Sequence, residues 1–349
     1  MTKEIKIGNI FIGGNNSIAI QSMTNTKTKD IASTVAQIFA LEKAGCDIVR
    51  VAVLDEADAL AIREIKSVVK LPVVADIHFN YNLALMAIEN GADKIRINPG
   101  NIDGEENLKK IIHCAKMHSI PIRIGVNSGS VNKNYLEKYK EKSTALIKSL
   151  LAQVAFFEKN KFDDLVLSVK STNVVETVDI NRKLSKLCSY PLHIGVTEAG
   201  PESVGIVKNS IGIGVLLLEG IGDTIRVSLT DNPVKEVYSA KKILRACGIS
   251  VSGINFVSCP TCGRCMTDMV PLANEIYERL KFIDASLSVA VMGCAVNGPG
   301  EAKDADVGIA FGNNEAILFK HGRVEKFLPI DNIVNTFVGI VEEMANAIE

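Results

Sequence analysis

The chain alternates short apolar runs with longer segments in which apolar residues recur at helical spacing. Eight of the runs are rich in β-branched residues, and they span 18–22, 47–53, 72–77, 94–98, 121–126, 165–170, 192–196 and 224–229. Each is followed by an amphipathic segment such as DIASTVAQIFALEKAGC or EADALAIREIKSVVK. Continuous apolar strands separated by such helices predict a parallel sheet covered by helices.

The number of repeats favours a closed barrel. Eight strand–helix units fit a (β/α)8 TIM barrel. An open, doubly wound sheet is the alternative, but it usually stops at about five or six strands and carries a glycine-rich turn after the first strand. Here GNIFIGG precedes the first strand. The predicted fold class is therefore α/β, with an N-terminal TIM barrel.

The pattern changes after the barrel. GINFVSC and LSVAVMGC predict strands, and MTDMVPLANEIYERLKFI predicts a helix between them. DADVGIAFG, EAILFKHG and RVEKFLP predict short antiparallel strands before a final helix. The 349 residues are enough for two domains. We predict a barrel domain over 1–250 and a smaller α+β domain over 251–349.

Composition restricts the partners and the compartment. The net charge of −1 gives no general attraction to nucleic acid or to an anionic membrane. The longest apolar stretch, IGIGVLLLEGIG, is too short to span a bilayer, and the first residues lack the features of a signal peptide. Eight cysteines at this length are more typical of metal binding or catalysis than of a disulfide framework. We predict a soluble, cytoplasmic protein without nucleic-acid or membrane partners.

Cationic residues gather at the C-terminal ends of the predicted strands, where active sites of TIM barrels form. These residues are Arg50, Arg96, Arg123, Lys170 and Arg226. A buried arginine is unfavourable unless it pairs with a carboxylate or an anion. Each cation could have its own carboxylate, but the strand ends offer only Asp76 and Glu198. The excess positive charge favours a small phosphorylated substrate, because the planar guanidinium group of arginine is suited to binding phosphate oxygens.

Uncharged side chains extend this predicted site. Asn98 and Asn127 open the turns NPGN and NSGS, which follow strands that carry arginine. The backbone N–H groups of such turns can contact phosphate oxygens. Ser228 ends the last predicted strand on the same face as Arg226. We expect all three side chains to lie near the substrate.

Two histidines and one acid have different predicted roles. His78 lies just past the third strand, on the same face as Asp76, and can donate to a substrate. His193 lies inside a strand and is predicted to be a core residue. Glu198, at the mouth of a cationic pocket, is a candidate proton donor or base. A structural salt bridge to one of the arginines is the alternative for Glu198.

The last third of the chain contains a clustered set of thiols. SCPTCGRC carries three at two-residue gaps, Cys259, Cys262 and Cys265. This spacing resembles the start of a ferredoxin motif, but no fourth cysteine and proline follow. Cys294 enters the turn NGPGE, which returns Glu301 toward its thiol. A zinc site would need another Cys or His as its fourth ligand, and His321 is distant. The residues favour an iron–sulfur site and leave Cys265 and Glu301 both open as the fourth ligand.

The motifs of both domains, taken together, resemble a known family. IQSMTNT, ADIHFN, KIRINPGN and GVTEAG, followed by SCPTCGR, MGCAVNGPGEA and ADVGIAFG, resemble the 4-hydroxy-3-methylbut-2-enyl diphosphate synthases. These are iron–sulfur oxidoreductases of the non-mevalonate isoprenoid pathway. The resemblance covers residues 18–312, and the length is that of the bacterial two-domain form. It implies reductive ring opening and dehydroxylation of 2-C-methyl-D-erythritol 2,4-cyclodiphosphate, with two electrons from flavodoxin or ferredoxin.

The resemblance also implies roles for individual residues. A 4Fe–4S cluster would be held by Cys259, Cys262, Cys294 and Glu301, with the carboxylate as the weak ligand that opens one iron. Cys265 would not be a ligand, and it departs from the threonine that the family commonly carries. Glu198 would assist protonation. The substrate-binding set would be Arg50, Asp76, His78, Arg96, Asn98, Arg123, Asn127, Lys170, Arg226 and Ser228. The family forms a head-to-tail homodimer in which the cluster domain of one chain caps the barrel of the other.

Two other functions fit some of these residues. One is a redox-silent TIM-barrel lyase or transferase that acts on a phosphorylated substrate, with an accessory domain pinned by zinc. The other is a non-catalytic redox sensor that uses the cluster. Metal and sulfide analysis would distinguish the zinc-containing lyase or transferase from the reductive enzyme. Turnover with a chemical reductant would distinguish the reductive enzyme from the redox sensor, which has none.

Overall fold

The computed structural model describes residues 1–127, 133–139, 141–249 and 252–347. The chain divides into two compact units, Met1–Cys247 and Gly248–Glu349. The boundary expected between residues 250 and 251 lies outside the described residues, so its position stays a prediction. No helix in the described ranges is long and apolar enough to cross a membrane.

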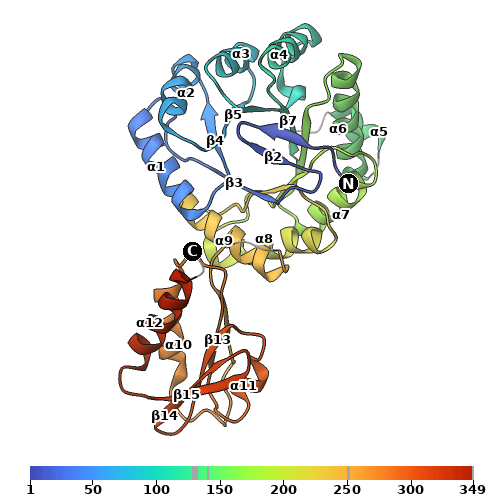
Figure 1. The fold of residues 1–349 in the computed structure, drawn as a ribbon. Coiled ribbons are helices and arrows are strands. Elements are labelled where there is room, and N and C mark those ends of the chain that lie inside the picture. Colours follow the sequence, from blue (N-terminus) through green and yellow to red (C-terminus); the bar gives the residue numbers. More distant parts are fainter. Residues whose placement is uncertain (128–132, 140, 250–251, 348–349) are drawn as a thin grey trace. The chain divides into compact units, whose positions relative to one another are not determined.

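The first unit is a parallel barrel (Figure 1). Its strands are β3 (Ala19–Met23), β4 (Ile48–Val53), β5 (Val73–Ile77), β6 (Lys94–Ile97), β7 (Ile122–Asn127), β8 (Leu165–Lys170), β9 (His193–Ile194) and β10 (Thr224–Ile225). They pair in the order β8-β7-β6-β5-β4-β3-β10-β9. A parallel bridge between Leu167 and Leu192 joins β8 to the segment that begins β9, which closes the ring. The predicted TIM barrel is confirmed.

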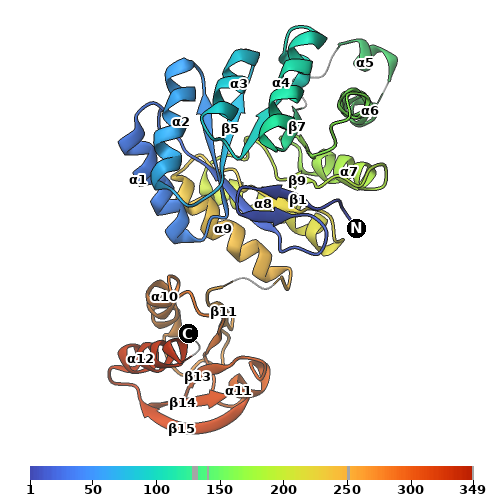
Figure 2. The same cartoon turned by 45° about the horizontal axis from the view of Figure 1, so that its top comes forward.

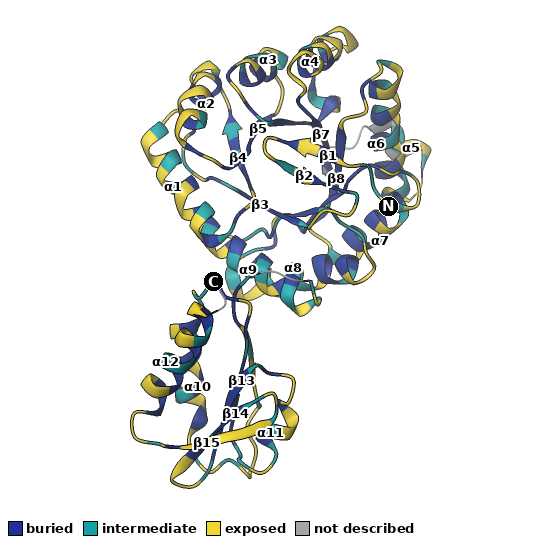
Figure 3. Cartoon of the chain, viewed as in Figure 1, coloured by how far each residue is buried: buried dark blue, intermediate teal, exposed yellow. Residues whose placement is uncertain are grey.

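Helices surround the strands and bury one face each, while their outer faces are exposed (Figure 3). They are α1 (Ile31–Ala44), α2 (Glu56–Val68), α3 (Tyr81–Glu89), η1 (Pro99–Asn101), α4 (Glu105–His118), α5 (Lys133–Lys138), α6 (Lys142–Lys159), α7 (Val174–Ser185), α8 (Glu202–Leu218) and α9 (Pro233–Ala246). Side chains cap several N-termini: Asp30, Asp55 and Asn173 each accept a hydrogen bond from the backbone N–H three residues ahead. Such caps satisfy donors that the first helical turn leaves open.

A hairpin before the barrel closes one of its ends (Figures 1 and 2). The apolar pattern predicts no element before residue 18, but β1 (Ile5–Ile7) and β2 (Ile10–Ile12) pair antiparallel there. The hairpin buries its isoleucines against side chains from the first two positions of β3, β4, β5 and β8. Because this end is filled, the functional cavity lies at the opposite, C-terminal ends of the strands.

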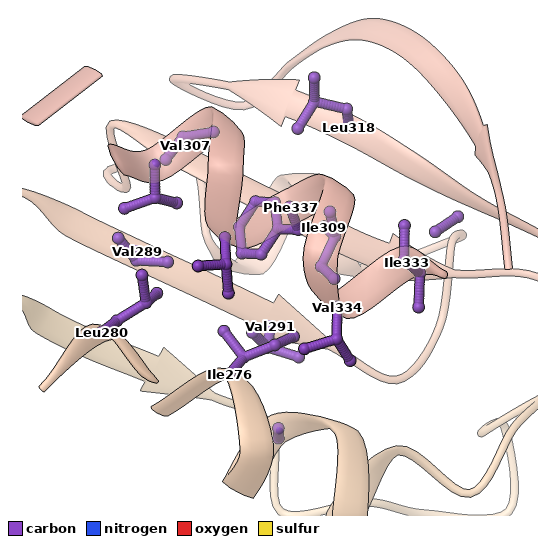
Figure 4. Packing of buried hydrophobic residues seen from close by; sticks show 14 of the residues in the cluster. Ile276, Leu280, Val289, Val291, Val307, Ile309, Leu318, Ile333, Val334 and Phe337 are labelled. Carbon is purple, nitrogen blue, oxygen red and sulfur yellow. The ribbon is translucent and has the colours of Figure 1, made fainter. Parts of the chain in front are cut away.

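The second unit is an α+β domain with a mixed five-stranded sheet in the order β11-β12-β13-β14-β15. Its elements are β11 (Asn255–Ser258), α10 (Met269–Leu280), β12 (Ser288–Met292), α11 (Gly298–Glu301), β13 (Val307–Phe311), β14 (Glu315–Lys320), β15 (Arg323–Pro329) and α12 (Ile333–Asn346). Helices α10 and α12 pack on one face of the sheet, with Ile276 and Phe337 against Val291 and Ile309 (Figure 4). Because β11 and β12 are parallel and Ser258 pairs with Val291, the loops that follow them leave the same edge of the sheet.

Candidate active site

The C-terminal ends of the barrel strands enclose a cavity of about 230 Å³. Its lining is Arg50, Asp76, His78, Arg96, Arg123, Gly125, Ser168, Lys170, Val196, Thr197, Arg226 and Ser228. Alternate side chains of a strand point to the same face, so residues from neighbouring strands converge here. The barrel therefore brings together the five predicted cations, along with three of the other predicted binding residues, Asp76, His78 and Ser228.

Asp76 is the carboxylate at the centre of one side of the cavity. Its Oδ1 lies 3.1 Å from Arg96 Nη1, and its Oδ2 lies 3.7 Å from Arg50 Nε and 3.7 Å from His78 Nε2. Burial alone would raise the pKa of Asp76, but Arg50, the hydrogen bond from His78 and Arg96 outweigh it and hold the pKa well below its usual range. Asp76 is therefore ionised and fixes the directions of two arginines.

A second carboxylate, Glu236 of α9, was missed by the sequence analysis. Arg226 Nε lies 3.3 Å from Glu236 Oε2, Ser22 Oγ donates to the same oxygen at 3.1 Å, and the Leu229 N–H donates to Oε1 at 3.1 Å. Glu236 is buried although it belongs to a helix on the outside of the barrel. Its signal in the sequence is an acid on the apolar face of α9, next to Val237.

Arg123 lines the cavity with hydrogen-bond donors that no described residue accepts. It is only 2% exposed, and its Nε and Nη1 have no partner among the described residues. Arg96 Nε is unpaired in the same sense. Burial, Arg50 and Arg96 together lower the pKa of Arg123. Buried donors without partners are rare in native proteins, and an anion in the cavity would satisfy them.

Lys170 completes the cationic lining. Its Nζ lies 3.2 Å from His193 Nε2. Gly195 lets it fit, because a Cβ there would lie 2.3 Å from Arg226 O and 2.8 Å from Lys170 Nζ. Gly195 also has a φ of +154°, which side chains rarely adopt. The position accepts glycine alone.

Three predicted residues are not part of the described cavity lining. Asn98 is buried and caps η1, with its Oδ1 accepting the Gly100 N–H at 3.2 Å. Glu198 is exposed, has a φ of +52° and follows Thr197, which does line the cavity. The side chain of Asn127 and the turn after it lie outside the described residues. Substrate roles for all three stay predictions.

The second unit contains a separate cavity lined by thiols. Its lining is Cys259, Pro260, Thr261, Cys262, Arg264, Cys265, Met292, Gly293, Cys294, Asn297, Gly298 and Glu301. All four predicted cluster ligands therefore face one space, and so does Cys265. The Gly293 N–H donates to Cys259 Sγ at 3.2 Å, and the Asn297 N–H donates to Cys294 Sγ at 3.5 Å. Backbone donors to sulfur are a common feature of iron–sulfur sites, where they tune the potential.

Gly293 is required for the thiols to approach one another. A Cβ on Gly293 would lie 2.5 Å from Cys265 Sγ, 2.6 Å from Met269 Sδ and 3.3 Å from Cys259 Sγ. Four thiols and the carboxylate of Glu301 line the same cavity. Thiolates are the usual protein ligands of iron–sulfur clusters, so the chemistry of these donors fits such a group.

Cys262 is the exposed thiol of this cavity. The backbone N–H and the side chain of Arg264 both donate to its sulfur and lower the pKa of Cys262. A thiolate is the form that binds metal, so Arg264 favours the ligand form of this residue.

Two family models together match nearly the whole chain. The GcpE TIM-barrel domain matches residues 2–241, and the GcpE protein C-terminal domain matches residues 255–343. The 4-hydroxy-3-methylbut-2-en-1-yl diphosphate synthase (flavodoxin) of Caldicellulosiruptor saccharolyticus is 56% identical over 339 residues, which are 97% of each chain. The protein of the same name from Clostridium perfringens is 51% identical over 342 residues, which are 98% of each chain.

Solved structures resemble the barrel at much lower identity. The dihydropteroate synthase of Yersinia pestis aligns with a TM-score of 0.52 and 12% identity, covering 70% of this chain and 98% of that one. The N-acetylneuraminic acid synthetase of Leptospira borgpetersenii gives a TM-score of 0.50 and 15% identity, covering 71% of this chain and 91% of that one. At these identities the likeness shows the fold alone.

Proposed function

This chain belongs to the GcpE family, and we propose that it reduces 2-C-methyl-D-erythritol 2,4-cyclodiphosphate to 4-hydroxy-3-methylbut-2-enyl diphosphate. The reaction is a step of the non-mevalonate isoprenoid pathway. The observation that carries the proposal is the cationic barrel cavity, where an anion would satisfy arginine donors that have no partner among the described residues. The chain is then an oxidoreductase, and the reducing cytoplasm, where free thiols persist, is its expected compartment.

Charge complementarity supports a diphosphate in the barrel. Among the described lining residues and their bonded partners, four arginines and the amine of Lys170 accompany the carboxylates Asp76 and Glu236. The excess charge suits a ligand with two negative charges. Arg123 and Arg96 carry N–H donors that the described residues leave without a partner, in the planar geometry that phosphate oxygens accept. Asp76 and Glu236 orient the arginines rather than neutralise them, so the diphosphate binds without large side-chain rearrangement.

The thiol cavity provides the residues for a redox group. Cys259, Cys262, Cys294 and Glu301 would hold a 4Fe–4S cluster. When bound, such a cluster supplies the two electrons that opening the cyclic diphosphate and releasing a hydroxyl as water require. Flavodoxin is named as the donor of the relatives, and ferredoxin is the alternative donor for this chain. Assays with each reduced carrier would identify the donor.

The test of the cluster uses protein purified without air. Iron and sulfide are counted, and spectra are recorded for the native chain, Cys265→Ser and Glu301→Ala. We expect Cys265→Ser to retain four iron and four sulfide per chain and Glu301→Ala to lose or alter them. One zinc per chain without sulfide would instead support the redox-silent lyase or transferase. Loss of the cluster in Cys265→Ser alone would make the site all-thiolate.

Glu198 is proposed as the proton donor to the product. It is the acid that follows the lining residue Thr197, and its exposure leaves it free to turn toward a bound substrate. Glu198→Gln keeps the size but removes the proton. Turnover should fall by about 10²-fold or more with cluster absorbance intact. Unchanged turnover would exclude a proton-transfer role for this residue.

The two cavities belong to different units, so catalysis requires them to meet around one substrate. We propose the arrangement that the family resemblance implies, a homodimer in which the cluster domain of one chain caps the barrel of its partner. Measuring activity and mass together over a dilution series tests it. Full activity in a strict monomer would exclude the dimeric arrangement.

A further inference from the structure

Four barrel strands each contribute one buried polar side chain, and we call this set the polar layer. Gln21, Lys94, His193 and Thr224 are all essentially inaccessible to solvent. TIM barrels usually fill such layers with Val, Ile and Leu. Both polar atoms of Gln21 and the Lys94 Nζ have no hydrogen-bond partner within the described ranges. Buried polar atoms that lack partners among the described residues, as in Gln21 and Lys94, reduce stability, so a functional reason for this layer is expected.

One chain of contacts connects this layer to the cavity. Lys170 lines the cavity and places its Nζ 3.2 Å from His193 Nε2. His193 Nδ1 lies 2.8 Å from Thr224 Oγ1. An ammonium group only donates, so a protonated Lys170 requires His193 to accept at Nε2 and to carry its hydrogen at Nδ1. That hydrogen is then donated to Thr224. The geometry suits a neutral histidine that fixes the direction of the Lys170 amine.

The charges around Lys170 oppose its protonation in the empty cavity. Arg123 of β7, Arg50 of β4 and Arg226, which follows β10, repel it, while Glu236 of α9 is the carboxylate that attracts it. Burial and these arginines lower the pKa of Lys170 well below its ordinary value. Burial, Lys170 and Arg123 likewise lower the pKa of His193 well below its ordinary value. A dianion beside the arginines would reverse the balance of charge at Lys170.

We infer that Lys170 takes up one proton when the cyclic diphosphate binds, and that His193 is the positioning residue that holds the resulting ammonium toward the ligand. The inference rests on the proposed substrate. The proton comes from solvent and forms an N–H bond on the Lys170 amine, so no electron transfer is involved. When the cavity is empty, a neutral Lys170 avoids repulsion between its amine and the neighbouring arginines. When the diphosphate is bound, the protonated Lys170 adds one more positive charge beside it.

Calorimetry of the oxidised holoprotein measures this proton directly. The cyclic diphosphate is titrated without air and without reductant, so that it binds but does not turn over. Each of its phosphates carries one strongly acidic hydroxyl, so the ligand itself does not titrate near neutral pH. The heat is measured in buffers of different ionisation enthalpy. The slope of the binding heat against the ionisation enthalpy of the buffer gives the number of protons exchanged, and we expect about one proton taken up per binding event. The dissociation constant should rise about tenfold for each unit of increase in pH.

Substitutions assign the proton to one residue. Lys170→Arg stays charged at every accessible pH, so it should bind with a slope near zero and little pH dependence. Lys94→Met and His78→Gln should keep the slope, because they remove the other nearby bases that do not bear the proton. His193→Gln offers an amide to both neighbours and should retain affinity and slope, whereas His193→Ala should lose both.

The possible results separate this inference from the proposed function. Binding with no dependence on buffer, or an unchanged slope in Lys170→Arg, overturns the proton uptake and leaves the substrate proposal standing. A slope lost in Lys94→Met but kept in Lys170→Arg also overturns it, because the proton would then belong to the deeper lysine. No binding of the cyclic diphosphate to native holoprotein would defeat both proposals.

Discussion

At the scale of single residues, Lys94 is a lysine of a barrel strand whose side chain is fully buried, with 0% of its surface exposed. Burial, Arg123 and Arg50 lower the pKa of Lys94 well below its ordinary value. The unfolded chain therefore binds a proton that the folded chain excludes, and this group makes stability rise with pH between its lowered pKa and about 10.4. We expect Lys94→Met to raise the free energy of unfolding by about 1–4 kcal/mol at neutral pH and to flatten its increase toward alkaline pH.

Thermal unfolding of the cluster-loaded protein between neutral and alkaline pH checks this expectation. Lys109→Met is the matched control, because Lys109 is an exposed lysine paired with Glu106 on the surface of α4. Its effect should stay within about 0.5 kcal/mol and show no such dependence on pH. A Lys94→Met protein less stable than the native chain would mean that the amine has a stabilising partner.

Gly195 and Gly91 form a matched pair for testing the cavity wall. Both have positive φ, but a Cβ on Gly195 would collide with Arg226 O and Lys170 Nζ, whereas nothing lies within 4 Å of one on Gly91. Gly91→Ala should show backbone strain alone, about 1–2 kcal/mol of unfolding free energy, with unchanged affinity for the cyclic diphosphate. Gly195→Ala should lose more stability and weaken binding about tenfold or more, since it displaces Lys170. Equal affinities would show that Lys170 tolerates the shift.

The residue types at the strand ends made most of the barrel cavity predictable. A cationic residue inside an apolar strand can be recognised from the sequence alone, and the alternation of side chains along a strand indicates which of these residues share a face. Glu236 and Lys94 were not found for opposite reasons. Glu236 acts from a helix outside the barrel, and its contact with Arg226 depends on how α9 packs. Lys94 opens a strand, where a lysine is usually exposed.

At the scale of elements, the hairpin β1–β2 fills the barrel end opposite the cavity. Ile7 is fully buried in it, while Phe11 on the same hairpin is 46% exposed. Ile7→Ala should lower the free energy of unfolding by about 2–5 kcal/mol, because it leaves a hole between the hairpin and the strands. Phe11→Ala should cost less than about 1 kcal/mol. Urea unfolding of both variants measures the difference, and equal effects would mean that the hairpin is not part of the barrel core.

The eight barrel strands were predictable as elements, but their extents were not. Periodicity indicates β9 over 192–196 and β10 over 224–229, yet each has two residues, His193–Ile194 and Thr224–Ile225. Gly195 directly follows β9 with a φ of +154°, and a Cβ there would collide with Arg226 O and Lys170 Nζ. The hairpin β1–β2 was not predicted, because its two strands have three residues each and are too short to show a periodic pattern of apolar residues. Local departures of this kind are expected at functional sites.

At the scale of the whole molecule, the chain divides its chemistry between two units with separate cores. The barrel offers cations for an anion, and the second unit offers thiols for a redox group. Neither cavity contains the residues of the other. The α+β unit could be predicted from its strand pattern, but which barrel meets which thiol cavity cannot be inferred from the periodicity of one chain, because it depends on the surfaces that assemble.

Mixing two inactive chains separates the possible assemblies. Lys170→Met disables the barrel cavity and Cys262→Ser disables the thiol cavity, so each variant alone should have little activity. If the cluster domain of one chain serves the barrel of its partner, a mixed dimer has one intact site, and random exchange should restore about a quarter of native activity. If each chain serves its own barrel, every site keeps one defect and mixing restores nothing. Mass measurement of the mixture must show exchanged dimers, and exchange without activity would exclude the cross-chain site.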